Sequence, residues 1–303
     1  SMVYLLVFEI IRSVPYGSFH FQFQYLLFPI TTLTFFYFKN KNVFSSVLCF
    51  SNIPPTIRLN VNVYTYFHNI LLLEKTGIMF NLKKLFIKFF KKNSNIWIVQ
   101  TSSMKVAIQN KLFIKTNKIL KLPFFKDFEF KNTEPYLKFK SKKFLYVSTG
   151  ETHKNHFNLI KAFNKLSHQD PNASLTLTVP LHFTVLCDFI NESILKGSNI
   201  INKGFVSKKI LNIEYQKANI FIFPSLRESF GLGLIEAAQY GLPIIASDLP
   251  YVFDVINPSH TFNPFNIDSI YDSMLSFDTK KFNKSQLKIK NKIYKLIKLL
   301  TTN

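Results

Sequence analysis

The apolar residues of this chain gather in short runs that are separated by helical or turn stretches. Runs of roughly four to eight apolar residues between turn residues are typical of buried strands. Such runs predict strands at 4–8, 34–37, 47–50, 61–66, 96–99 and 119–122. A second series is predicted at 144–147, 175–179, 200–201, 220–223 and 244–246. Because strands that alternate with helices favour a parallel sheet covered on both faces, we expect an α/β fold.

A polar stretch near the middle of the chain separates the two series of strands. Residues 124–143 are charged and include Pro135, which is typical of a linker. A chain of 303 residues is long enough for two domains with sizeable cores. We therefore expect one domain over 1–135, a second over 136–280 and a C-terminal helix over 281–303, since residues 282–300 are Lys-rich and have a helical period.

Two carboxylates bracket a glycine-bearing turn at residues 228–236. Gly231 and Gly233 allow the main chain to approach a ligand where a Cβ would collide, and a helix is predicted over 234–240. The first turn of a helix offers peptide nitrogens to a phosphate, here those of Phe230, Gly231 and Leu232. Glu228 and Glu236 suit sugar and ribose hydroxyls. A structural explanation stays open, in which Glu228 caps the helix and Glu236 is solvated.

The residues around this turn resemble a known family. Residues 223–237, continued by 241–248, are similar to the E-x7-E region of GT4-type retaining glycosyltransferases. Residues 146–163 resemble that family's strand, Lys-Asn loop and helix, where a basic pair grips the donor diphosphate. His153 stands here where many relatives have Arg, beside Lys154. Residues 201–207 resemble the segment that places main-chain groups beside the nucleotide base.

The resemblance implies a GT-B fold, with two Rossmann-like domains facing a central cleft and a terminal helix that crosses back to the first domain. It implies retaining transfer from a nucleotide-diphosphate sugar. The sequence shows no Asp-x-Asp metal pair, and Lys154, Arg227 and the helix amides can supply positive charge to the departing diphosphate, so we expect neither a metal nor a further cofactor. The implied catalytic residues are Glu228, Lys154 and His68, the last at a position where relatives carry a histidine near the reacting sugar. The implied donor-binding residues are Thr149, Gly150, His153, Phe205, Val206, Arg227, Ser229, Phe230, Gly231, Leu232 and Glu236.

On the acceptor side the likeness is weaker. Gly17 and Ser18 are similar to the family's glycine-rich loop, but the usual paired glycines are absent. A lone histidine after a strand, as at His68, also occurs as a structural hydrogen-bonding residue, so both interpretations stay open. The first domain, at about 135 residues, is short for the family.

The net charge of +21 is compatible with several anionic partners. Only Arg12, Arg58 and Arg227 carry a guanidinium, and all other basic residues are Lys. Because base readout and bidentate phosphate contacts usually use Arg, we do not expect a nucleic-acid partner. Abundant Phe, Lys, Asn and Ile also indicate that part of the charge reflects compositional drift.

One basic segment, residues 82–92, is patterned. A helical spacing would place its apolar residues on one side and its lysines largely on the other. The apolar side holds Leu82, Leu85, Phe86, Phe89 and Phe90. The last lysine of the segment is Lys92. Such a helix fits an anionic membrane surface, with an ordinary surface helix as the alternative.

The stretch between Arg12 and Lys39 has no formal charge and is long enough to span a membrane. Its glutamines, threonines and Pro29 argue against a spanning helix, and the first ten residues lack the basic region of a secretory signal. Cys49 and Cys187 lie in apolar runs, which is typical of buried thiols in a reducing compartment. We therefore expect a cytoplasmic protein, peripheral on the inner face of the membrane.

These expectations converge on an enzyme of surface polysaccharide or glycolipid synthesis that uses a glycan or lipid-linked acceptor. The alternative is a GT-B-fold scaffold or binding protein with weakened catalysis at an anionic membrane surface. His153 and the short first domain keep that alternative open.

Overall fold

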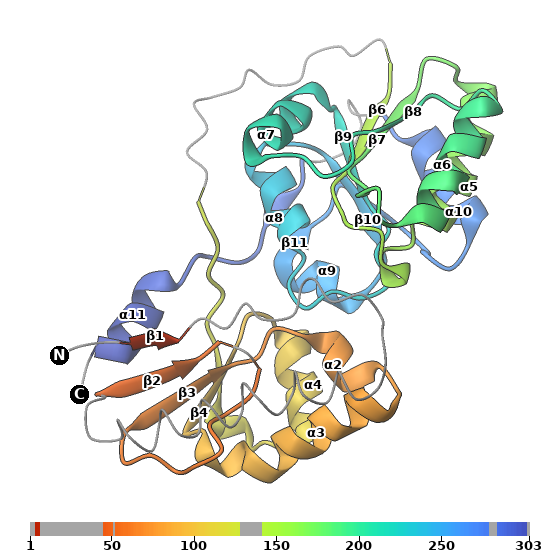
Figure 1. Ribbon diagram of the computed structural model, residues 1–303. Coiled ribbons are helices and arrows are strands. Elements are labelled where there is room, and N and C mark those ends of the chain that lie inside the picture. The colour runs from red at the N-terminus through yellow and green to blue at the C-terminus, as the bar shows by residue number, and fades with distance from the viewer. Residues whose placement is uncertain (1–3, 7–44, 51, 128–140, 279–283, 302–303) are drawn as a thin grey trace. The chain divides into compact units, whose positions relative to one another are not determined.

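The structure is a computed structural model that describes residues 4–6, 45–50, 52–127, 141–278 and 284–301 (Figure 1). The chain divides into two compact units, each with its own parallel sheet. Unit 1 comprises Ser1–Phe124 and Asn291–Asn303, and unit 2 comprises Phe125–Lys290. The strand predicted at 34–37, the uncharged stretch before Lys39, and both Gly17 and Ser18 lie outside the described residues.

The sheet of unit 1 has its strands in the order β1-β2-β3-β4-β5, all parallel. The strands are β1 (Tyr4–Leu6), β2 (Ser46–Cys49), β3 (Asn62–Tyr66), β4 (Ile96–Val99) and β5 (Ile119–Lys121). One face is covered by α2 (Ile70–Glu74), α3 (Ile78–Phe90) and α4 (Ser102–Leu112), and the other by α11 (Ile293–Thr301) (Figure 1). The short helices η1 (Lys91–Asn93) and η2 (Thr116–Lys118) precede β4 and β5.

Alternation along the strands explains why both faces of this sheet are covered. Trp97 and Val99 on β4 pack toward α2 and α4, whereas Ile98 between them packs toward Leu296 and Leu300 of α11. Successive side chains of a strand point to opposite faces, so an almost continuous apolar run requires cover on both sides.

Helix α11 is shorter than the helix predicted over 282–300, and the prediction is wrong for residues 284–292. There β13 (Gln286–Leu287) pairs antiparallel with β11 (Ile256–Asn257) in unit 2. Leu287 and Ile289 alternate with polar residues, which is the period of a strand rather than a helix, and both pack against the core of unit 2.

Residues 82–90 of the predicted amphipathic segment lie in α3, which begins earlier, at Ile78, and Lys91 and Lys92 lie in η1. Helix α3 contacts the core through Ile87, which is fully buried, and through the partly buried Phe80. Leu85 and Phe89, from the predicted apolar side, are 63% and 78% exposed. The apolar side is therefore only partly used in packing.

The sheet of unit 2 has the order β12-β10-β9-β6-β7-β8, again all parallel. The strands are β6 (Lys143–Tyr146), β7 (Ser174–Leu177), β8 (Ile200–Asn202), β9 (Ile220–Phe223), β10 (Ile244–Ser247) and β12 (His260–Phe262). Helices α5 (His156–Gln169), α6 (Thr184–Leu195) and α10 (Ile267–Ser276) cover one face. Helices α7 (Lys208–Lys217), α8 (Leu232–Gln239) and α9 (Pro250–Val255) lie on the other side (Figure 1).

The strand order of unit 2 reverses between β6 and β9. From β6 the chain runs outward through β7 and β8, and then returns to β9 on the other side of β6 before continuing to β10 and β12. In open α/β sheets, ligands bind outside the carboxyl ends of the strands at such a reversal. The loops after β6 and β9 are therefore the first place to look for a site.

Over the parts of the chain that the structure describes, no helix is long and apolar enough to cross a bilayer. Cys49 in unit 1 and Cys187 in unit 2 are both buried and carry free thiols.

Candidate functional site

The loops that follow β6 and β9 are bound to each other by main-chain contacts. The loop after β6 contains η3 (Thr152–Lys154) and leads into α5, while the loop after β9 leads into α8. The amide of Leu226 donates to the carbonyl of His153 at 2.8 Å. Asn155, in the left-handed conformation with φ 61°, donates from Nδ2 to the carbonyl of Pro224 at 3.1 Å. These bonds hold the two loops side by side at the reversal point of the sheet.

The two loops bring Lys154 and Glu228 together. Lys154 Nζ lies 2.7 Å from Glu228 Oε1, and the side chains are only 19% and 12% exposed. By contrast, the side chains of Lys196 and Glu192, which pair at the carboxyl end of α6, are 70% and 57% exposed. Because solvent screens a partly buried pair less, the Lys154–Glu228 contact is the stronger electrostatic feature. Lys154 and Glu228, which were predicted from separate motifs, thus form one ion pair, which we call the charged cluster.

The amino end of α8 lacks a side-chain cap among the described residues, and Phe230 and Gly231 just before it are buried. Its N-cap is Gly231, which has φ 76°, and among the described residues no side chain caps the helix. The helix begins at Leu232, two residues before the predicted start, and Gly233 in its first turn lies against the rings of Phe221 and Phe223. Uncapped amides and the helix dipole favour an anion at this end. Glu228 does not cap the helix, since its carboxylate pairs with Lys154.

Glu236, one turn further along α8, is held by a residue that the sequence interpretation missed. Tyr215 of α7 donates a hydrogen bond from its hydroxyl to Glu236 Oε2 at 2.9 Å. The Tyr215 ring stacks on Tyr240, with the ring centres 4.6 Å apart. Burial raises the pKa of Glu236, and the hydrogen bond from Tyr215 partly opposes that shift. The carboxylate is therefore fixed through one oxygen.

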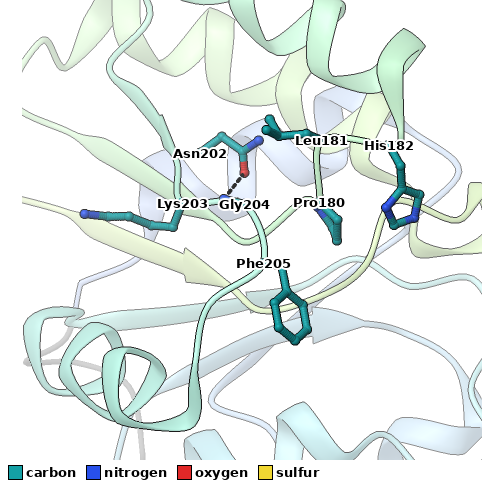
Figure 2. A pocket seen from close by; sticks show the side chains of 7 residues that line it. All are labelled: Pro180, Leu181, His182, Asn202, Lys203, Gly204 and Phe205. Carbon is teal, nitrogen blue, oxygen red and sulfur yellow. Dashed lines mark hydrogen bonds between the residues drawn. The ribbon is translucent and has the colours of Figure 1, made fainter.

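A cavity of about 460 Å³ lies beside the loops after β7 and β8 (Figure 2). Its floor is held by Asn202, whose Oδ1 accepts hydrogen bonds from the amides of Gly204 and Val179 at 3.2 Å and 2.9 Å. Phe205 and Leu181 are 88% and 77% exposed at this cavity. The lining residues are Pro180, Leu181, His182, Asn202, Lys203, Gly204 and Phe205.

Of the predicted donor residues, Phe205 lines this cavity and Val206 does not. The loop 180–182 was missed because its residues match no recognisable motif, although the run of apolar residues that ends at Val179 predicts a strand end there. The cavity volume falls in the ordinary range for small-molecule sites.

The loop after β6 explains two further predicted positions. A Cβ on Gly150 would lie 2.4 Å from Cγ of Phe183, so only glycine fits there. The hydroxyl of Thr149 donates to the carboxylate of Glu151, and both side chains are exposed. The other predicted donor residues lie near the charged cluster in sequence; His153 and Ser229 are half-buried and Arg227 is exposed.

His68, the predicted residue of unit 1, follows the carboxyl end of β3. Its amide donates to Oδ1 of Asn52 at 2.7 Å, and its ring stacks on Tyr66 with centres 5.1 Å apart. Partial burial lowers the pKa of His68, although a hydrogen bond with the main chain of Tyr66 opposes the shift. The residue remains exposed to solvent, so the imidazole is accessible and largely neutral above its ordinary pKa.

Comparison with known proteins gives concordant matches. The family model described as Glycosyl transferases group 1 matches residues 127–296. The serotype-specific mannosyltransferase WbdA of Escherichia coli is 33% identical over 119 residues, which are 39% of this chain and 14% of that protein. The chain thus spans only a small part of that relative's length.

Two solved structures show the same architecture. Sucrose-phosphate synthase from Thermosynechococcus elongatus aligns with a TM-score of 0.67 and 16% identity, covering 86% of this chain and 70% of that one. HepE of Anabaena, solved in complex with UDP and glucose, aligns with a TM-score of 0.59 and 15% identity, covering 73% and 64%. At these identities the likeness concerns the fold.

Proposed function

The chain belongs to the Glycosyl transferases group 1 family and has the GT-B type of α/β fold, and from this we propose that it transfers a sugar from a nucleotide-diphosphate donor to a glycan or lipid-linked acceptor. We assign the reaction to the synthesis of a surface polysaccharide or glycolipid. The mannosyltransferase named among its relatives supports that assignment.

The observation that carries the proposal is the Lys154–Glu228 pair at the reversal point of the unit 2 sheet. In the proposed complex, the donor diphosphate lies at the amino end of α8, against the amides near Gly231. Lys154 and Arg227 add positive charge where the nucleoside diphosphate departs. Preorganised cations and amides of this kind stabilise the charge that develops on a leaving group, and they require no metal or cofactor to do so.

The two carboxylates take different parts of the donor. Glu228, beside Lys154, steadies the donor sugar, and the reaction retains the anomeric configuration. Glu236 receives the ribose hydroxyls through the oxygen that Tyr215 leaves available. The cavity beside Phe205 accepts the base by stacking and main-chain contacts, since the side chain of Asn202 is already hydrogen-bonded to the main chain of Val179 and Gly204.

A turnover assay tests this function. The purified protein is incubated with UDP-, GDP- and ADP-sugars and a panel of glycan and glycolipid acceptors, and release of the nucleoside diphosphate is followed. Glu228→Gln and Lys154→Met should each lower kcat on the order of 100-fold or more, as expected when a preorganised charge is removed.

The matched control uses the exposed pair at the carboxyl end of α6, because Glu192→Gln and Lys196→Met remove the same charges without touching the site. These variants should keep the parental rate. Equal rates for all the variants would reject the site, and a parental protein without turnover on any donor would favour the scaffold alternative. His68→Ala tests the acceptor-side role, for which a loss of rate without a loss of donor affinity is expected.

We further propose that unit 1 rests on an anionic membrane at the inner face. Unit 1 contains 18 basic and two acidic residues and so carries +16 of the total charge of +21, whereas the 20 basic and 15 acidic residues of unit 2 give only +5. Compositional drift alone would distribute the positive charge more evenly between the two units. Ile78, Leu85 and Phe89 of α3 add exposed apolar area to this basic unit.

Vesicle flotation tests the membrane proposal. The protein should bind vesicles of phosphatidylglycerol and not those of phosphatidylcholine alone, and Leu85→Gln with Phe89→Gln should weaken that binding. The matched control is Val185→Gln with Leu195→Gln, which removes two apolar residues of α6 that are 73% and 88% exposed. Equal binding by both double variants would reject α3 as the contact.

A further inference from the structure

A buried tyrosine hydroxyl joins the two loops that carry Lys154 and Glu228. Tyr146 is the last residue of β6 and is fully buried. Its hydroxyl lies 2.9 Å from the carbonyl oxygen of Lys154 and 2.9 Å from Oγ of Ser225. A phenol has one proton, and a carbonyl can only accept, so Tyr146 donates to Lys154 and Ser225 donates to Tyr146. The chain of bonds thus runs from one loop to the other.

Ser225 is itself fixed at a second point. Tyr251 of α9 donates from its hydroxyl to the carbonyl of Ser225 at 2.6 Å, and both residues are buried. Ser225 lies three residues before Glu228. The side chain and the main chain of Ser225 are therefore held by two tyrosines, which fixes the start of the loop that presents Glu228.

Lys154 is held in a comparable way. Its carbonyl is bound by Tyr146, and the neighbouring carbonyl of His153 is bound by the amide of Leu226. The ammonium group of the same lysine is the one that meets Glu228 at 2.7 Å. A long, flexible side chain keeps one geometry more readily when its main chain is fixed on both sides.

We propose that Tyr146 is a positioning residue of the transfer site, with Ser225 and Tyr251 as its support. Its hydroxyl holds the main chain of Lys154 against the loop of Glu228, so that the ammonium group is in place before the donor arrives. This proposal rests on the proposed function, and it adds residues that are neither among the implied catalytic and donor-binding residues nor in the Lys154–Glu228 pair.

The test removes the hydroxyl and keeps the ring. In Tyr146→Phe the aromatic contacts with Phe223 and His156 are retained, whereas the bonds to Lys154 and Ser225 are lost. Misplacement of a catalytic group by about 1 Å can cost on the order of 100-fold in rate, so kcat should fall by roughly 10- to 100-fold. KM for the donor should change much less. Tyr64→Phe, a buried tyrosine in unit 1, should leave kcat unchanged.

A double variant distinguishes positioning from a general structural role. If Tyr146 acts through Lys154, then Tyr146→Phe should have no further effect on kcat in the Lys154→Met background. Multiplied losses in the double variant would overturn the proposal, as would an unchanged kcat in Tyr146→Phe measured well below its melting temperature.

The geometry provides a readout that does not depend on turnover. A crystal structure of Tyr146→Phe should show Lys154 Nζ displaced from Glu228, whereas a pair unchanged at 2.7 Å would overturn the proposal. Absence of turnover by the parental protein would reject the proposed function and would leave this structural comparison to decide on Tyr146.

Discussion

His156 should make the stability of unit 2 sensitive to mild acid. It is the first residue of α5 and only 2% exposed, and neither ring nitrogen has a hydrogen-bond partner among the described residues. Burial lowers the pKa of His156 to about 3, and the positive charges of Lys154 and His153 contribute in the same direction. The folded protein therefore holds a neutral imidazole in a place that strongly disfavours the charged form.

The sign and size of the effect follow from linkage. Below the unfolded pKa of about 6.5, the unfolded chain binds a proton at His156 that the folded chain does not, so stability falls as the pH decreases toward about 3. From about pH 7.5 to about pH 5 the loss from this residue amounts to about 2 kcal/mol. Roughly four fifths of that loss occurs below about pH 6.5.

The perturbation is His156→Phe, which keeps an aromatic ring against Tyr146, whose ring centre lies 4.9 Å away. Urea unfolding of both proteins at several pH values measures the difference. The parental curve should lose about 2 kcal/mol more than the variant between these pH values. At neutral pH the variant should be at least as stable, because an unpartnered buried donor costs about 1–3 kcal/mol.

The control is His168→Phe, an exposed histidine on the same helix, which should keep the parental pH dependence. Parallel pH profiles for the parental protein and His156→Phe would refute the reasoning, because they would mean that the buried imidazole takes up a proton without opposing the fold.

Three further predictions concern the site loops. Gly150→Ala should lower the free energy of unfolding by about 1–3 kcal/mol, because its Cβ would meet Phe183. In a double-mutant cycle followed by thermal unfolding, Gly150→Ala should cost less in a chain that also carries Phe183→Ala. Tyr215→Phe should weaken the binding of nucleoside diphosphates roughly 5- to 10-fold in calorimetry, since Glu236 loses its fixed orientation; an unchanged affinity would separate Glu236 from the ribose. Phe205→Ala should weaken nucleotide binding by about 1–3 kcal/mol without affecting the melting temperature, because the ring is 88% exposed and packs against little; a lower melting temperature would indicate a structural role.

Strands that consist of one continuous apolar run are predicted accurately from the sequence. The strands at 96–99 and 220–223 have the predicted bounds, because each is a continuous apolar run in a sheet that is covered on both faces. Strand β12 was missed, since His260 and Thr261 leave only Phe262 to mark an apolar run. The predicted C-terminal helix is too long at its amino end, because the spacing of the lysines there is compatible both with a helix and with an alternating strand.

The residues of the site also fall into two groups: those that a local sequence motif identifies, and those whose role depends on tertiary contacts. Lys154 and Glu228 were identified through motifs, and the adjacent positions of β6 and β9 explain why loops 74 residues apart meet. Tyr146, Tyr215 and His156 could not be assigned from sequence, because their roles depend on partners across the sheet or between helices. A tyrosine in an apolar strand predicts burial, but it does not reveal which carbonyl its hydroxyl will meet.

A crystal structure with a bound nucleoside diphosphate tests the central claim most directly. The account predicts that diphosphate oxygens lie within about 3.2 Å of amides in the first turn of α8 and of Lys154 Nζ, with the ribose at Glu236. A diphosphate ordered elsewhere on unit 2, or an amino end of α8 that stays unoccupied at saturating nucleotide, would contradict it.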